Sequence, residues 1–216
     1  MSGMLLNTVK LAYPMQSVIP NAYGAVLGVL ARTSEPLSGR RIAALTSPRF
    51  SQSRVNSVLV ELTRDGIADV ESRPPASYYR LNHEHVAAPG ILALASMWQT
   101  LLGRIQTSVG EWRTPPVAAW VFGSAARAEA DTESDLDILI IQPDQVSSDE
   151  SWQQQIDDLA EQVYRWSGNS CEPLVLTESD LRAALQRDDR LIQELRQDAI
   201  HLSGVQPAAL LGRRRG

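Results

Sequence analysis

The stretch VAAWVFGSAARAEADTESDLDILII, residues 117–141, decides the fold of the second half of the chain. Its two apolar runs, VAAWVF and LDILII, have the length and the β-branched or aromatic content of buried strands. Gly123 and Ser124 stand where the first run ends, and Ala125–Glu129 has a helix-like composition. We therefore predict a strand, a sharp turn, a short helix and a second strand in this order.

Two acidic residues, Asp135 and Asp137, mark the start of the second predicted strand. Because side chains alternate along a strand, residues i and i+2 face the same way. Two carboxylates on one face repel each other unless a cation lies between them, and Mg²⁺ (or Mn²⁺) prefers such oxygen ligands. The glycine before the short helix lets the backbone approach a phosphate, and the helix N-terminus offers N–H groups to it. The stretch therefore predicts a site for a metal–nucleoside triphosphate.

This pattern resembles the nucleotidyltransferase superfamily of DNA polymerase β, whose signature is Gly-Ser, a short spacer and Asp-x-Asp in a strand. Here ten residues separate Ser124 from Asp135. The sequence departs from the family at Ala128, where glycine is usual. The positions that match the fuller family pattern are Gly123, Ser124, Ala126, Arg127, Ser134, Asp135 and Asp137.

The resemblance implies roles for these residues. Asp135 and Asp137 would be catalytic and would bind the metal, while Gly123, Ser124 and Arg127 would bind the nucleotide.

A third catalytic carboxylate of the superfamily comes from a neighbouring strand. Glu172 is the only acid in Cys171–Leu176, which we predict to be a short third strand. It would complete the metal site or accept the proton of the attacking hydroxyl. Many small family members have an amide at this position.

Composition and the distribution of charge limit the class of protein that the chain can be. It has 216 residues, 44% of them hydrophobic, and no apolar run of the ~20 residues that a membrane span needs. Residues 1–90 carry nine basic and six acidic residues, whereas the remainder carries eleven and nineteen. This asymmetry suggests two modules with different partners. The single cysteine, Cys171, and the lack of a recognisable signal peptide predict a protein of the reducing cytoplasm, with this thiol used for packing.

The first module has the pattern of three helices followed by a hairpin. We predict helices over Asn21–Arg32, Gly39–Leu45 and Ser51–Arg64, because apolar residues recur at helical spacing between capping residues. Two short strands, Ile67–Val70 and Tyr78–Leu81, follow around a tip that contains Pro74-Pro75. The order resembles the winged helix-turn-helix of ArsR-like bacterial regulators.

This resemblance implies binding to double-stranded DNA through the third helix. Gln and Asn can pair with adenine and Arg with guanine in the major groove, while other arginines contact phosphates. A fold of this kind is also used for protein contacts, and that alternative stays open. The residues that we expect to contact DNA are Arg40, Arg41, Gln52, Ser53, Arg54 and Asn56.

A linker and a tail complete the chain. Over Ile91–Gln106 apolar residues recur with spacings of three and four, which predicts one helix whose seam serves either intrachain docking or a homodimer. We expect helices over Trp152–Trp166 and from Thr177 to about His201. The domains expected from the sequence are a winged helix over 1–88, a linker helix over 89–114, a nucleotidyltransferase over 115–204 and a disordered tail over 205–216.

The sequence thus predicts an α+β protein: a winged helix-turn-helix, a linker helix and a mixed-sheet polymerase β-like nucleotidyltransferase domain. The expected activity is Mg²⁺-dependent transfer of a nucleoside monophosphate from an NTP to a hydroxyl of a protein or nucleic-acid acceptor. The other class of function is a non-catalytic regulator or antitoxin-like protein whose nucleotide site only senses ligand or binds a partner.

Overall fold

The computed structural model describes residues 14–46, 48–127, 135–146 and 150–212. The chain divides between Trp98 and Gln99 into two compact units. Each unit has its own sheet and core, so each is described by itself. No helix in the described part of the chain has the length and apolar character needed to cross a membrane.

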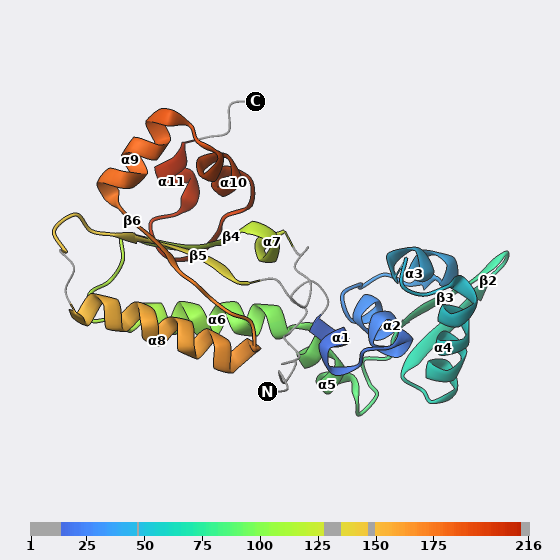
Figure 1. Ribbon diagram of the computed structural model, residues 1–216. Helices are drawn as coiled ribbons and strands as arrows, with labels where there is room; N and C mark the ends of the chain where they lie inside the picture. The colour runs from blue at the N-terminus through green and yellow to red at the C-terminus, as the bar shows by residue number, and fades with distance from the viewer. Residues whose placement is uncertain (1–13, 47, 128–134, 147–149, 213–216) are drawn as a thin grey trace, which may run out of the picture. The chain divides into compact units, whose positions relative to one another are not determined.

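The first unit, which precedes Gln99, contains the predicted helices and hairpin (Figure 1). Asn21 caps α2 by accepting a hydrogen bond from Tyr23 N at 2.9 Å, and Ser51 caps α4 through Arg54 N at 3.3 Å. The elements are α1 (Pro14–Val18), α2 (Ala22–Ala31), β1 (Leu37–Ser38), α3 (Gly39–Thr46), α4 (Gln52–Arg64), β2 (Ala68–Arg73), β3 (Ala76–Leu81) and α5 (Ala88–Ala95).

A small antiparallel sheet and a helical core hold this unit together. The strand order is β1-β3-β2, and β2 pairs with β3 from Ala68↔Leu81 to Arg73↔Ala76. Both hairpin strands extend further into the predicted tip than the apolar pattern indicates, so the turn is confined to Pro74-Pro75. The apolar residues that recur at helical spacing in α4 are buried, and they are Val55, Val58, Leu59 and Leu62.

The linker segment differs from the single helix that we predicted. Helix α5 ends before Ser96, and a second helix, α6 (Met97–Gly110), begins after it. Ile91 of α5 packs in the core of the first unit, whereas Leu101 and Ile105 of α6 are buried in the second unit. The expected continuous seam is therefore divided between two intrachain cores.

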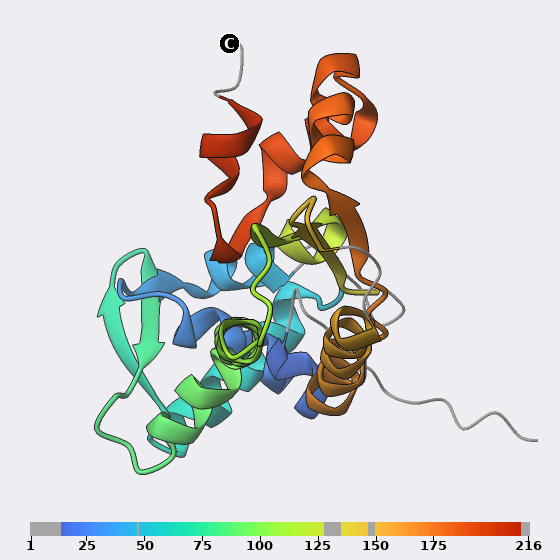
Figure 2. The same ribbon diagram turned by 90° about the vertical axis from the view of Figure 1, so that its left-hand side faces the viewer.

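The second unit is a mixed sheet between two layers of helices. Its strands are β4 (Ala118–Phe122), β5 (Asp137–Gln142), β6 (Leu174–Thr177) and β7 (Ile200–Gly204). The order is β6-β5-β4-β7, in which only β5 and β6 run parallel. Figures 1 and 2 show α6 and α8 (Glu150–Ser167) on one face and α9 (Glu178–Arg187), α10 (Arg190–Asp198) and α11 (Pro207–Leu211) on the other.

The end of the chain corrects two sequence expectations. The helix expected to run to about His201 stops at Asp198 as α10, and Ile200–Gly204 forms strand β7 beside β4. His201 lies in this strand, where its Nε2 is 2.9 Å from Gly204 O. Pro207–Leu211, expected to be disordered, forms helix α11, and Leu211 is buried in the core that α9 and α10 cover. Residues 213–216 lie outside the described part of the chain.

Candidate active site

Gly123 begins the site because it turns the chain from β4 into helix α7 (Gly123–Ala126). Every residue of β4 is buried, and its last residue, Phe122, pairs with Asp137, the first residue of β5. Gly123 has φ +73°, which side chains rarely allow, and a Cβ on it would overlap Asp137 Oδ2. The glycine thus permits both the turn and the close approach of the Asp137 carboxylate to the backbone. Ser124, half-buried, follows as the second residue of α7.

The two predicted aspartates flank a buried residue. Leu136 is fully buried, and its N–H donates to Ser170 O at 2.8 Å, which fixes this segment beside the chain leading to β6. Asp135 is exposed and Asp137 half-buried. Asp137 is the first residue of β5 and Asp135 lies just before it, near enough for its charge to act on Asp137. That both carboxylates share one side of the segment stays a prediction.

Electrostatics show that Asp137 is unfavourably placed as an anion. Burial raises its pKa above the ordinary value of 3.8, and the charges of Asp135 and Glu194 raise it further. The Arg127 guanidinium acts in the opposite direction. A bound cation would relieve this repulsion, so the two aspartates fit a hard divalent ion by charge and by donor type.

Arg127 is braced by a residue that the sequence does not reveal. Its Nη1 lies 2.7 Å from Oδ2 of Asp198, a carboxylate whose side chain is only 8% exposed. Asp198 and Glu194 both come from α10, so this helix supplies acids around the Gly-Ser turn and the aspartates. No spacing rule could have pointed to them, because they approach the site only through the packing of α10.

Glu172 is exposed and lies just before β6, which begins at Leu174 and not at Cys171. The parallel register pairs Leu139 of β5 with Leu174 of β6. Asp137 lies two residues before Leu139 and Glu172 two residues before Leu174, so the two acids occupy equivalent positions on neighbouring chain segments. Within the described ranges, no group of three or more His, Cys, Asp or Glu side chains is placed to hold a metal ion. The role of Glu172 therefore stays a prediction.

Cys171 is a packing residue in this structure. It is buried, and burial together with the charges of Asp137 and Asp135 raises the pKa of its thiol to about 12. The thiolate is therefore scarce at neutral pH, which agrees with the role assigned from the sequence. Ala128 and Ser134 of the motif lie outside the described residues.

The residues predicted to contact DNA lie at the starts of α3 and α4. Arg40 and Arg41 are exposed in the first turn of α3, and Gln52, Ser53 and Arg54 are exposed in the first turn of α4. Asn56 is also exposed, and its Oδ1 lies so near Gly39 that a Cβ there would be 2.7 Å away. This contact places the start of α3 beside α4, so the predicted residues lie on neighbouring elements.

One family model matches residues within the second unit. Residues 108–202 match the family model of the polymerase beta nucleotidyltransferases, so this part of the chain is a polymerase β-like nucleotidyltransferase domain. No curated protein matches the chain. Among solved structures, it is similar to a chain of a toxin–antitoxin crystallised with AMP-PNP, with 17% identity, a TM-score of 0.37, and coverage of 51% of this chain and 80% of that one. The chain is also similar to a proposed nucleotidyltransferase from Sulfolobus solfataricus, with 21% identity and a TM-score of 0.29. This match covers 50% of this chain and 84% of that one.

Proposed function

We propose that the nucleotidyltransferase domain transfers a nucleoside monophosphate from an NTP to a hydroxyl acceptor with the aid of Mg²⁺ or Mn²⁺. The observation that carries this proposal is the contact of Gly123 with the Asp137 carboxylate, at the point where β4 and β5 begin to pair. It brings the backbone suited to a phosphate next to the carboxylates suited to its metal.

Each residue has a distinct task in this proposal. Gly123 and Ser124 hold the phosphates, and Arg127, braced by Asp198, adds a positive charge beside them. Asp135 and Asp137 would hold the divalent ion, which neutralises charge on the triphosphate when bound. The acceptor oxygen forms a bond to the α-phosphorus, the bond to pyrophosphate breaks, and Glu172 takes the acceptor proton.

Labelled nucleotides test this activity directly. The protein is incubated with Mg²⁺ and each NTP labelled at the α-phosphate, with and without cell lysate. We expect a labelled acceptor and released pyrophosphate, both lost in the double variant Asp135→Asn/Asp137→Asn. Asp157→Asn, at an exposed position of α8, is the matched control and keeps the activity.

The alternative is a nucleotide sensor. The raised pKa of Asp137 favours a sensor over a purely structural site, because a bound cation would relieve the repulsion on this carboxylate even when no transfer follows. The same experiment separates the two. Binding of Mg²⁺–NTP in calorimetry without label on any acceptor would support the sensor and count against the transferase.

For the first unit we propose binding to double-stranded DNA by a winged helix-turn-helix over residues 20–85, as part of a homodimer. The exposed polar first turn of α4 beside the exposed Arg40 and Arg41 supports this assignment. Since Ile91, Leu101 and Ile105 are used within the chain, another surface would form the dimer. Gel-shift titration with duplex DNA fragments at several salt concentrations tests the proposed DNA binding. If no duplex shifts at low salt, a role in protein contacts is favoured.

A further inference from the structure

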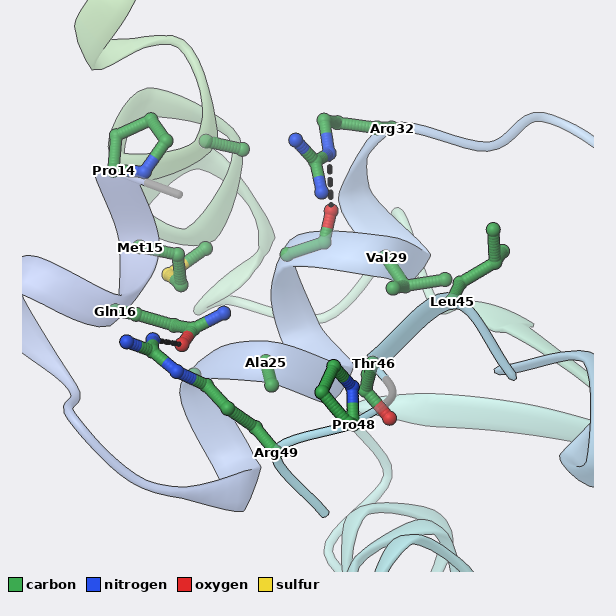
Figure 3. Close-up of a pocket in the computed structure, with 13 residues that line it drawn as sticks. Pro14, Met15, Gln16, Ala25, Val29, Arg32, Leu45, Thr46, Pro48 and Arg49 are labelled. Carbon is green, nitrogen blue, oxygen red and sulfur yellow. Dashed lines mark hydrogen bonds between the residues drawn. The ribbon is translucent and has the colours of Figure 1, made fainter. Parts of the chain in front are cut away.

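The first unit contains a cavity that the proposed DNA binding does not use. Its volume is about 170 Å³, and it is lined by residues of α1, α2, the end of α3 and α5, together with Pro48 and Arg49 (Figure 3). The apolar part of the wall includes Met15, Ala25, Val29 and Leu45. Met15, Ala25 and Val29 are buried, whereas Leu45 is 42% exposed, so an apolar surface stays open at the cavity.

The two charged residues in the described lining of the cavity are both arginines. Figure 3 shows Arg32 at one end and Arg49 at the other, with Met15 between them. In the described residues no ion pair includes either arginine. The cavity therefore combines an apolar body with two exposed arginines that have no acidic partner among the described residues, and this positive charge suits an anion.

At one end of the cavity, Arg49 is held by a buried amide. Its Nη1 donates to Oε1 of Gln16 at 2.6 Å, and Gln16 is only 7% exposed. This bond orients the amide oxygen toward the arginine, and the amide still has two N–H donors of its own. A guanidinium next to an amide is a matched pair of donors for a carboxylate. At the other end, Nε of Arg32 donates to Gly28 O at 2.9 Å, which keeps this second charge beside the cavity.

We propose that this cavity binds a small organic carboxylate whose apolar part is about one ring in size. A dry cavity of about 150 Å³ takes up one benzene ring, so 170 Å³ sets the scale of the ligand. The carboxylate meets Arg49 and the Gln16 amide, and the ring lies against Met15 and Ala25.

The place of the cavity links ligand binding to α4. Leu45 and Thr46 end α3, and Pro48 and Arg49 lead from it into α4. A ligand in the cavity therefore contacts Pro48 and Arg49, which shortly precede the start of the helix proposed to read DNA. This link rests on the proposed DNA binding, whereas the site itself does not.

Calorimetry on the full chain tests the site with matched ligand pairs. Benzoate, phenylacetate and cyclohexanecarboxylate are compared with benzamide and phenylacetamide, which keep the ring, and with acetate, which keeps the charge. We expect at least one ring carboxylate to bind about tenfold or more tighter than its amide and than acetate. Amides that bind as well as the carboxylates, or no heat from any ring carboxylate, would overturn the proposal.

Variants then place the ligand in this cavity. We expect Arg49→Gln to weaken binding about tenfold or more, Arg32→Gln to weaken it less, and Ala25→Leu to abolish it by filling the space. Arg64→Gln, an exposed position at the end of α4, is the control and keeps the affinity. Unchanged affinity in Arg49→Gln or Ala25→Leu would refute the assignment. If a variant does not fold, the comparison of carboxylates with amides on the parent protein decides the question instead.

A DNA titration with and without the bound carboxylate tests the link. A changed DNA affinity supports it. Ligand binding that leaves DNA affinity unchanged overturns the link and keeps the site, and a chain that binds the carboxylate but no DNA refutes the proposed DNA binding alone.

Discussion

Gly123 lies against Asp137 so closely that a Cβ at residue 123 would overlap the carboxylate oxygen Oδ2. Any side chain at residue 123 would therefore displace the Asp137 carboxylate, and this close approach gives the first prediction.

Gly123→Ala will remove Mg²⁺–ATP binding, measured by calorimetry, because the methyl group pushes the Asp137 carboxylate from its place. The left-handed backbone at φ +73° adds a cost of about 1–2 kcal/mol to folding. Gly103→Ala in α6 is the control, since nothing lies within 4 Å of its added Cβ. Equal nucleotide affinity in Gly123→Ala and the parent would contradict the placement of the phosphate at this turn.

The raised pKa of Asp137 predicts that a neutral residue at this position increases the stability of the fold but prevents Mg²⁺–ATP binding. The native state holds this proton more tightly than the unfolded chain, so stability falls as the pH rises from the unfolded pKa through the folded one. Asp137→Asn should therefore raise the melting temperature at pH 7 by a few degrees, about 2–4 °C for each kcal/mol, and abolish Mg²⁺–ATP binding. The gain should vanish at a pH below the unfolded value.

Asp144→Asn is the matched control for the sign of this effect. The Ser179 backbone N–H, followed by the Ser179 hydroxyl, lowers the pKa of Asp144, so its contribution is present above the unfolded pKa and is lost as the pH falls. This variant should lower the melting temperature at pH 7. A lower melting temperature for Asp137→Asn as well would contradict the sign derived from the raised pKa of Asp137.

Glu172→Gln should leave nucleotide affinity nearly unchanged and reduce transfer by about 100-fold or more, the scale expected for the loss of a general base. Glu194→Gln is the comparison, because Glu194 is the acid whose charge acts on Asp137 from α10. Rates of labelled-acceptor formation measure both variants. An unchanged rate in Glu172→Gln together with a reduced rate in Glu194→Gln would assign the third acid to α10.

Asp198→Asn should raise KM for the NTP by about tenfold and change kcat less. The variant loses the carboxylate whose Oδ2 lies 2.7 Å from Arg127 Nη1 and which holds this arginine in place for the nucleotide. Arg127→Lys, which keeps the charge but not the fork of donors, should show the same split. Asp189→Asn, at the other end of α10, is a control for helix stability. A fall in kcat alone would argue that Asp198 does not act through substrate binding.

The DNA-binding prediction concerns two groups of residues. The combined alanine variant of Gln52, Arg54 and Asn56 should lose sequence preference, whereas Arg40→Ala/Arg41→Ala should weaken all duplexes alike and reduce the salt dependence. Gel-shift titrations of specific and random duplexes measure both. Because Asn56 lies beside Gly39, the melting temperature of Asn56→Ala must be compared with the parent to separate binding from stability.

The centre of the candidate site could be predicted because its determinants are local. A glycine turn between two apolar runs and two aspartates at strand spacing need no knowledge of the rest of the chain. The remaining parts of the site depend on tertiary packing. Asp198 and Glu194 reach the site only because α10 packs over the sheet, and their spacing from Gly123 carries no signal.

The linker shows why a good periodic pattern can mislead. Ile91, Leu101 and Ile105 keep a helical spacing through Ser96, although they serve two separate cores. Periodicity reports which residues are buried, not what buries them. In the same way Ile200–Gly204 continues an apolar pattern after α10, and it is a strand because β4 offers an edge to pair with.

The pairing of β7 with β4 also has a consequence for shortened forms of the protein. β4 is an inner strand only because Ile200–Gly204 covers one side of it. Cleavage or premature termination before Ile200 would leave Ala118–Phe122, an uncharged apolar segment, with unpaired N–H and C=O groups along its length. Such an edge is a template for pairing with another chain. Truncated products should therefore aggregate through β4, the strand that leads into Gly123.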